Sequence, residues 1–423
     1  MATADNSSGA FAALRQRNFG LYAAGSTVSL IGMWVQRIAI GWLTWDLTHS
    51  GTWLGLIAFA DLFPIVVLTP LAGLVADRYD RLKITILSQY LASAQALLLA
   101  FLTFTGDITI WWLVVLSAFI GVVWAFNTAA RLSMIPNLVE HRYIASAVAL
   151  NSAAFNAARF IGPALAGGIM AIWGVGEAFL FNAATFVVFI VALMKMRLIN
   201  VETSGRSRGG MLSQSFNGIG YARRHPGIGP ILVLLFAMAI GVKPMLELLP
   251  GFADAVFHRG IEGLAQLTAS AGLGALITAV WLAQRGRMVG LTNIALLALI
   301  ASAITILAFT ASDWYPLGLV ACFVFGITIT MAGTATQSLM QNAVEGHMRG
   351  QVMSLYGLVY RGGPAVGALI MGAAADLVGL QWALASGAVI CMAAWIWLAR
   401  QRIAVTQALE HPPQNTDPRY ESR

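Results

Sequence analysis

The sequence predicts an all-α membrane protein with twelve transmembrane helices in two pseudo-symmetric six-helix bundles. Its 423 residues are 58% hydrophobic and only 10% charged, with a mean hydropathy of +0.76, which is more apolar surface than a soluble core can bury. The apolar runs are about 20 residues long and do not alternate with polar residues, which is typical of membrane-spanning helices and not of barrel strands. Short motifs also recur between the two halves, as an internal repeat would produce.

The apolar runs fall into six on each side of a polar central segment. The first run follows Arg15 and Arg17, and His49-Ser50 separates it from the second. A charged turn, residues 77–83, separates the second from the third. In chain order the predicted spans are residues 18–45, 51–76, 84–105, 110–132, 146–172, 175–198, 230–256, 262–284, 291–311, 314–338, 352–374 and 379–400.

The segments outside the spans divide the chain into domains. Residues 1–17 form a polar cytoplasmic extension that lacks the short apolar core and cleavage site of a signal peptide. Residues 18–200 and 230–402 are the two predicted bundles. Residues 201–229, rich in Gly, Ser and Arg, are predicted to be a cytoplasmic linker, and residues 403–423 a disordered cytoplasmic tail.

Outside the spans and at their ends, the positive charges fall on one side of this topology, with Arg259 as the one cation predicted on the opposite side. The cations on the first side are Arg15, Arg17, Arg78, Arg81, Lys83, Arg131, Arg142, Lys195, Arg197, Arg206, Arg208, Arg223, Arg224, Arg285, Arg287, Arg349, Arg400 and Arg402. The positive-inside rule therefore places both termini in the cytoplasm, and the expected location is a bacterial inner membrane. Topology also explains the net charge of +7. No nucleic-acid partner is expected, because the cations are spread over many segments and form no single patch.

Two motifs repeat between the halves. Asn137-Leu138-Val139-Glu140 precedes the fifth span and recurs as Asn342-Ala343-Val344-Glu345 before the eleventh. Gly162-Pro163-Ala164 within the fifth span recurs as Gly363-Pro364-Ala365 within the eleventh. Two repeated bundles joined by a linker are the architecture of transporters that bind their substrate at the interface between repeats.

The turn after the second span carries a family resemblance. The segment from Gly73 to Lys83 resembles the Gly-x-x-x-Asp-Arg-x-Gly-Arg-Arg/Lys loop of the major facilitator superfamily, with Asp80 in place of the second glycine. Trp34 and Gln36, the segment 47–50 and Asn156-x-x-Arg159-x-x-Gly162-Pro163-Ala164 resemble the drug and siderophore exporter branch, to which enterobactin and macrolide exporters belong. This resemblance implies secondary transport by alternating access, and export more than import.

The same turn is predicted to hold a conformational latch. Asp77 is expected to accept hydrogen bonds from the free amides of the next helix and to meet a cation from a neighbouring helix, with Arg131 at the inner end of the fourth span as the candidate. Such a pair, together with Arg78 and Arg81, would hold the cytoplasmic face closed and break when the bundles move. The alternative is that these charges only mark topology.

The repeated Gly-Pro pairs are the next candidates. Pro163 and Pro364 each remove one backbone hydrogen bond, and Gly162 and Gly363 allow close helix contacts. In the superfamily, a Gly-Pro-x-x-Gly-Gly run in the fifth helix is associated with antiporters. Here the run is one residue longer, which weakens the antiport inference, and ordinary close packing of helices is the alternative.

Charges within the spans are costly unless they are paired or face water, so each one is a functional hypothesis. Arg37 and Asp61 lie at one depth of the antiparallel first and second spans and are placed to form a buried ion pair. Asp61 is therefore the first candidate for proton coupling, and a permanent bridge between the two helices is the alternative. Lys243 and Glu247, four residues apart in the seventh span, are predicted to share a face and neutralise each other. Glu247 is the second proton-coupling candidate.

Polar and aromatic residues of several spans are predicted to line a central cavity. The candidates are Arg37, Trp124, Asn127, Asn156, Arg159, Lys243, Gln337, Tyr356, Tyr360 and Arg361. Cations outnumber acids at this depth, which favours an anionic substrate, and the aromatic rings suit a flat amphipathic molecule better than a sugar. For each aromatic residue, helix packing or an interfacial position is the alternative.

The sequence gives no support for an enzyme. It contains no phosphate-binding loop or nucleophile motif, and Cys322 and Cys391 lie within spans, so neither a metal site nor another cofactor is predicted. The predicted function is secondary transport by alternating access, with proton-coupled export of small amphipathic or anionic compounds such as drugs or siderophores. The alternative is a proton-coupled importer of an aromatic or vitamin-like nutrient. The expected partners are a small molecule, protons and the lipid bilayer, and the protein is expected to be a monomer.

Overall fold

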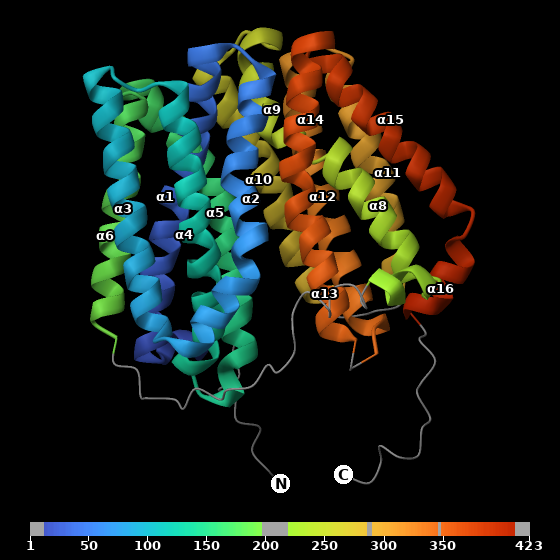
Figure 1. Ribbon diagram of the computed structural model, residues 1–423. Coiled ribbons are helices and arrows are strands. Elements are labelled where there is room, and N and C mark those ends of the chain that lie inside the picture. Colours follow the sequence, from blue (N-terminus) through green and yellow to red (C-terminus); the bar gives the residue numbers. More distant parts are fainter. Residues whose placement is uncertain (1–11, 197–218, 286–289, 346–347, 411–423) are drawn as a thin grey trace.

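The computed structural model describes residues 12–196, 219–285, 290–345 and 348–410. The first six long helices are α1 (Arg17–Thr48), α2 (Gly51–Arg78), α3 (Arg81–Thr105), α4 (Ile110–Met134), α5 (Ile144–Ile172) and α6 (Val175–Met194). The second group consists of α8 (Ile228–Gly241), α9 (Met245–Gly251), α10 (Gly260–Arg285), α11 (Leu291–Thr310), α12 (Tyr315–Ala343), α13 (Arg349–Gly357), α14 (Gly363–Val378) and α15 (Leu380–Ala399). The two groups form bundles that stand side by side (Figure 1).

Two of the predicted spans in the second bundle are interrupted helices. The seventh consists of α8 and α9, which a turn at Lys243-Pro244 separates, followed by the π-helical segment Phe252–Val256. The eleventh consists of α13 and α14, which the π-helical segment Leu358–Gly362 joins. Pro244 at the first break and Pro364 after the second explain both in part, because proline lacks a backbone N–H and cannot complete a regular helical turn.

Eleven segments of the described chain are long and apolar enough to cross a membrane. The twelfth predicted span is α1, which is 32 residues long but less apolar than the others. Its interior face carries Ser26, Ser29 and Gln36, which are buried against other helices of the same bundle. Protein contacts therefore cover the polar face of α1.

Side-chain amides join the helices inside the first bundle. Gln36 of α1 donates to the Gln95 side chain of α3 over 3.0 Å, and Asn182 of α6 donates to Gln36 over 2.8 Å. Ser29 donates to Gln89, which in turn donates to Asn127 of α4. These buried groups pair with one another where lipid offers no partner, except that Nδ2 of Asn127 has no hydrogen-bond partner among the described residues.

Small residues bring the two bundles together along two seams. α2 packs against α14, and a side chain at Gly55 would collide with the backbone of Ala368. α5 packs against α10, and a side chain at Gly272 would collide with the backbone of Arg159. We call the side on which α1 begins and α15 ends the terminal side, and the opposite side the far side (Figure 1).

The two Gly-Pro repeats occupy corresponding places in the two bundles. Gly162 of α5 lies against Trp34 of α1, and Gly363 at the start of α14 lies against Ala239 of α8. The first and fifth spans thus pack together as the seventh and eleventh do. Close contact between helices is what these glycines provide here.

The predicted tail is corrected in part. Residues 402–410 are a helix, α16 (Arg402–Glu410), whose Val405 and Leu409 are fully buried against the second bundle. The Glu410 carboxylate accepts hydrogen bonds from the backbone N–H groups of Gly290 and Thr292. The prediction of disorder is wrong for residues 403–410, whose Val405 and Leu409 lie one helical turn apart and share a face. Residues 1–11 of the predicted extension, 201–218 of the linker and 411–423 of the tail lie outside the described residues.

Candidate functional site

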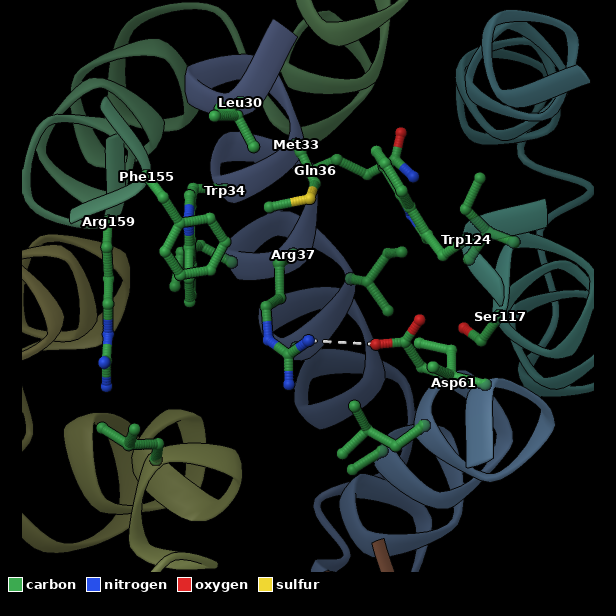
Figure 2. Close-up of a pocket in the computed structure, with 18 of the residues that line it drawn as sticks. Leu30, Met33, Trp34, Gln36, Arg37, Asp61, Ser117, Trp124, Phe155 and Arg159 are labelled. Atoms are coloured by element: carbon green, nitrogen blue, oxygen red, sulfur yellow. Dashed lines mark hydrogen bonds and ion pairs between the residues drawn. The ribbon is translucent and has the colours of Figure 1, made fainter. Parts of the chain in front are cut away.

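A cavity of about 540 Å³ lies between the two bundles. Its walls come from α1, α2, α4 and α5 of the first bundle and from α9, α10 and Arg361 of the second. Figure 2 shows the side chains of Arg37, Asp61, Trp124 and Arg159 pointing into the same space. This volume is in the range of sites that enclose small molecules.

A charged triad lies at the centre of the cavity wall. The Arg37 guanidinium of α1 donates from Nη1 to Asp61 Oδ2 of α2 over 3.0 Å and from Nη2 to Glu247 Oε1 of α9 over 2.6 Å. The side chains of Arg37 and Asp61 are 32% and 22% exposed, so the triad faces the cavity instead of being sealed within a bundle. The Arg37–Glu247 contact crosses from one bundle to the other.

The interrupted seventh span explains why Glu247 reaches Arg37. The chain turns at Lys243-Pro244, so α9 begins anew at Met245 and Glu247 lies in its first turn. The prediction that Lys243 and Glu247 neutralise each other on one helical face is wrong, because no continuous helix joins them. Lys243 instead donates to the backbone oxygen of Tyr360 over 2.9 Å, and its ammonium lies 3.2 Å from the centre of the Tyr360 ring.

Two arginines of the cavity wall have no such partners. Arg159 of α5 and Arg361 of the π-helical segment make no hydrogen bond or ion pair with any side chain or backbone group that the structure describes. The Arg159 guanidinium lies 5.8 Å from the centre of the Trp34 ring, and the Arg37 guanidinium lies at the same distance from that ring. Trp34 also contacts Phe155 edge to face, with ring centres 6.2 Å apart.

The predicted cavity residues divide into two groups. Arg37, Trp124, Asn127, Arg159 and Arg361 line the cavity, together with both proton-coupling candidates. Asn156, Lys243, Gln337, Tyr356 and Tyr360 do not line it.

Local contacts explain the second group. Asn156 donates to the backbone of Ser152 one turn earlier, and Tyr356 is buried with its hydroxyl donating to the Gly333 backbone oxygen. The side chain of Gln337 is exposed on α12. For these residues, rotation of the helix directs the side chain away from the cavity, and spacing along the sequence does not reveal that rotation.

A buried amide network, which the predicted cavity residues do not include apart from Asn127, lies behind the cavity. Gln95, Asn182 and Gln89 were not singled out, although each is an amide side chain at mid-depth in an otherwise apolar span. Amides at matching depth in different spans are a signal that would have found them, because lipid leaves such groups without partners. The network holds Gln36 and Asn127, which both line the cavity.

The far side of the cavity is closed by contacts between the bundles. The Asp376 carboxylate at the end of α14 accepts hydrogen bonds from the backbone N–H groups of Gly51 over 2.6 Å and Thr52 over 3.1 Å, and from the Ser50 hydroxyl. Trp45 of α1 donates from its indole Nε1 to Asp254 over 2.9 Å. A carboxylate at the start of a helix is stabilised by free amides and by the helix dipole, so Asp376 ties α14 to α2.

The terminal side differs. Arg131 donates to Tyr22 and Ser26, and its guanidinium lies 5.4 Å from the ring centres of Tyr22 and Phe189, all within the first bundle. Arg81 donates to the backbone oxygen atoms of Ala76 and Ser133.

In the charged turn, the predicted helix-capping contact is made by Asp80 and not by Asp77. The Asp80 carboxylate accepts hydrogen bonds from the Leu82 and Lys83 amides. Asp77 and Arg78 are exposed, and Asp77 forms no ion pair with any residue that the structure describes. The expected contact between Asp77 and Arg131 is therefore not made in this conformation, and the latch stays a prediction.

Comparisons with known proteins agree with this architecture. The sequence profile of the transmembrane secretion effector family matches residues 8–421. The staphyloferrin A transporter of Staphylococcus aureus is 27% identical over 363 residues, which are 85% of this chain and 90% of that protein. Macrolide efflux protein A of Streptococcus pyogenes is 21% identical over 377 residues, which are 88% and 93% of the two chains.

A solved structure agrees at the level of fold. The crystal structure of a bacterial homologue of the human lysosomal transporter Spinster has a TM-score of 0.68 and 14% identity, and the match covers 93% of this chain and 97% of that one. The prediction of an all-α major facilitator fold is thereby confirmed. The predictions of a multi-pass transporter that carries a small molecule and is no enzyme are confirmed by the family and the relatives. The chain belongs to the transmembrane secretion effector family of the major facilitator superfamily and is a secondary transporter.

Proposed function

We propose that this protein is a proton-coupled exporter of small amphipathic or anionic compounds that works by alternating access. The positive-inside rule supports a cytoplasmic location of the terminal side and of both termini in a bacterial inner membrane. The closed far side would then face outward, and the cavity would receive its substrate from the cytoplasm. We take the transporting unit to be a monomer, because each chain holds a complete cavity between its own two bundles.

The observation that carries the proposal is one guanidinium shared by two carboxylates from different bundles. Arg37 and Asp61 belong to the first bundle, whereas Glu247 belongs to the second. When the bundles separate on the far side, the Arg37–Glu247 contact must break, and an unpaired carboxylate at this depth is costly. Once the far side has opened, protonation of Glu247 from outside removes that charge.

Asp61 has a complementary role in this scheme. It keeps Arg37 paired within the first bundle while Glu247 is protonated, so the guanidinium is not left without a partner. In the outward-open state, a proton taken up from outside would neutralise Glu247 and let the far side close again after substrate release. Loss of the proton to the cytoplasm would restore the Arg37–Glu247 contact and the state described here.

The relatives support the class of cargo. One relative is named for the transport of staphyloferrin A and another for macrolide efflux. The cavity walls combine the apolar side chains of Leu30, Met33 and Ile57 with the charged groups of Arg37 and Arg159. Such a lining suits amphipathic compounds of the siderophore or drug type.

The test is transport in proteoliposomes of known orientation. Pre-loaded aromatic anions and cations would be followed while a pH gradient of either sign is imposed. Antiport predicts that an inward proton gradient drives substrate outward and that substrate in turn drives proton flux. Glu247→Gln and Asp61→Asn are expected to abolish the response to the gradient, whereas Glu140→Gln, in an exposed loop pair with Arg142, leaves it intact.

Other outcomes would overturn the proposal. Accumulation of substrate in the direction of the proton gradient would show symport, and thus the importer alternative. A proton flux that no compound changes would remove the coupling altogether.

A further inference from the structure

We propose that Arg159 and Arg361 form an anion-binding pair, one arginine from each bundle, that binds a substrate with two carboxylates on an aromatic or other flat body. This inference rests on the proposed function, because it names the class of substrate for the same cavity. It assigns the negatively charged part of the substrate to these two arginines and not to Arg37.

The first step is the relation between the two arginines. Arg159 precedes Gly162-Pro163 in α5, and Arg361 precedes Gly363-Pro364 at the start of α14, so the repeat places them at corresponding positions that differ by one residue. The π-helical segment Leu358–Gly362 changes the angular register of the helix at that point. Both side chains consequently line the same cavity in spite of the offset.

The second step is that the other buried cations are already satisfied. Arg37 binds two carboxylates, Arg131 binds Tyr22 and Ser26, and Lys243 binds the backbone of Tyr360. Arg159 and Arg361 have no hydrogen-bond acceptor among the residues that the structure describes. A guanidinium offers five N–H donors in a planar fork and cannot lose its charge, so it needs an anion or water.

The third step is the charge balance of the cavity. Four arginines line it, Arg37, Arg131, Arg159 and Arg361, with two carboxylates, Asp61 and Glu247, so the lining carries two net positive charges when both acids are ionised. Both carboxylates are hydrogen-bonded to Arg37, and neither is hydrogen-bonded to Arg159 or Arg361. Two unneutralised guanidinium groups that face one cavity call for a ligand with two negative charges.

The fourth step is the shape of the wall beside Arg159. The Trp34 ring lies between the guanidinium groups of Arg37 and Arg159, 5.8 Å from each, and meets the Phe155 ring edge to face. In Figure 2, Trp34 and Phe155 lie next to Arg159 along the wall. A flat ligand can pack against these rings while its carboxylates reach the arginines.

The test is equilibrium binding to the purified protein with a matched series of naphthalene probes. The probes are naphthalene-2,6-dicarboxylate, 2-naphthoate and naphthalene-2,6-dicarboxamide, which share one ring system and differ in charge. The dicarboxylate is expected to bind at least tenfold more tightly than the diamide, since each charge-assisted contact contributes roughly that factor. The monocarboxylate should lie between them.

Variants separate the anion pair from a general effect of charge. Arg159→Gln and Arg361→Gln should each weaken dicarboxylate binding about tenfold and leave diamide binding unchanged. Arg159→Lys keeps the charge and should retain part of the affinity, which guards against a folding defect in the glutamine variant. Arg142→Gln removes an exposed arginine outside the cavity and serves as the matched control.

The outcomes distinguish this inference from the proposed function. Equal binding of dicarboxylate and diamide, or dicarboxylate binding that both glutamine variants leave intact, would overturn the anion pair even if proton-coupled export of another compound is found. Dicarboxylate binding that depends on both arginines, in a protein without proton-coupled flux, would support the pair and refute the coupling.

Discussion

The far half of the interface between the bundles is closed by charged and small residues, whereas no hydrogen bond or ion pair between described residues joins the bundles in the terminal half. Three contacts between the bundles lie at or beyond the depth of the Arg37 triad. They are Arg37–Glu247, Trp45–Asp254 and the contact of Asp376, at the end of α14, with the first residues of α2. On the terminal side, Arg81 and Arg131 are satisfied within the first bundle. The far half of the interface is therefore held closed by a few identifiable contacts that the terminal half lacks. Each of these contacts can be removed separately by substitution.

The largest effect is expected for Arg37→Ala, which removes the central contact of the far half. Asp61 and Glu247 would be left without a cation. We expect the free energy of unfolding to fall by about 3 kcal/mol. This value is at the low end for buried ion pairs, because water in the cavity solvates the triad. Thermal unfolding in detergent measures this loss. The variant Arg37→Met with Asp61→Asn and Glu247→Gln should recover most of it, and a single variant as stable as the natural protein would contradict the interpretation.

Gly55→Val is expected to open the far half by steric conflict. Its side chain would meet the Ala368 backbone across the α2–α14 seam, and overpacking of this kind costs about 2 kcal/mol. Spin labels at Thr109→Cys and Ala311→Cys, on the far side of each bundle, would report a longer distance. The matched control is Gly73→Val on the same helix, where a side chain meets open space.

Asp376→Asn should also shift the population toward the state open on the far side, but by less than Gly55→Val. The amide still accepts a hydrogen bond but loses the charge that the start of α2 stabilises, so we expect a shift of about 1 kcal/mol, roughly fivefold in population, toward the state open on the far side. The same pair of labels measures it. Asp46→Asn is the control, since Asp46 is exposed on the far side and bonded to no described residue; an equal shift in both variants would exclude a specific role for Asp376.

The smallest effect on this conformation is expected for Asp77→Asn on the terminal side. Asp77 is exposed here and pairs with no described residue, so unfolding should change by less than about 0.5 kcal/mol. If the predicted latch forms when the terminal side closes, the transport rate in proteoliposomes will nevertheless fall. A variant that transports at the natural rate would leave Asp77 as a mark of topology alone.

Several features of the site followed from the sequence because they depend on depth in the membrane. Arg37 and Asp61 stand at the same distance from the turn that joins their helices, and the structure pairs them over 3.0 Å. Arg159 and Arg361 were found because they flank a repeated motif, and both line the cavity. Depth and repetition can be counted along the chain, since the rise per residue of a helix is constant.

Other features of the site could not be predicted from the sequence, because they depend on how each helix is rotated about its axis and on where helices are interrupted. Tyr356 and Tyr360 share the eleventh span with Arg361, yet neither lines the cavity. Glu247 was assigned to Lys243 because a continuous helix was assumed, and the turn at Pro244 separates the two residues. The helical content of residues 402–410 was missed because its stability comes from burial of Val405 and Leu409 against the bundle.

Composition and the pattern of apolar runs are enough to predict that this chain crosses a membrane as helices, in two related bundles, with most cations outside the spans on one side. Lipid cannot hydrogen-bond to the backbone, so apolar runs of this length have few other ways to fold. Packing of the two bundles, in contrast, establishes that Glu247 shares Arg37 with Asp61 and that Arg159 and Arg361 have no hydrogen-bond partner among the described residues. Those pairings depend on which faces two separate bundles turn toward each other, and the spacing of residues within one helix carries no record of that choice.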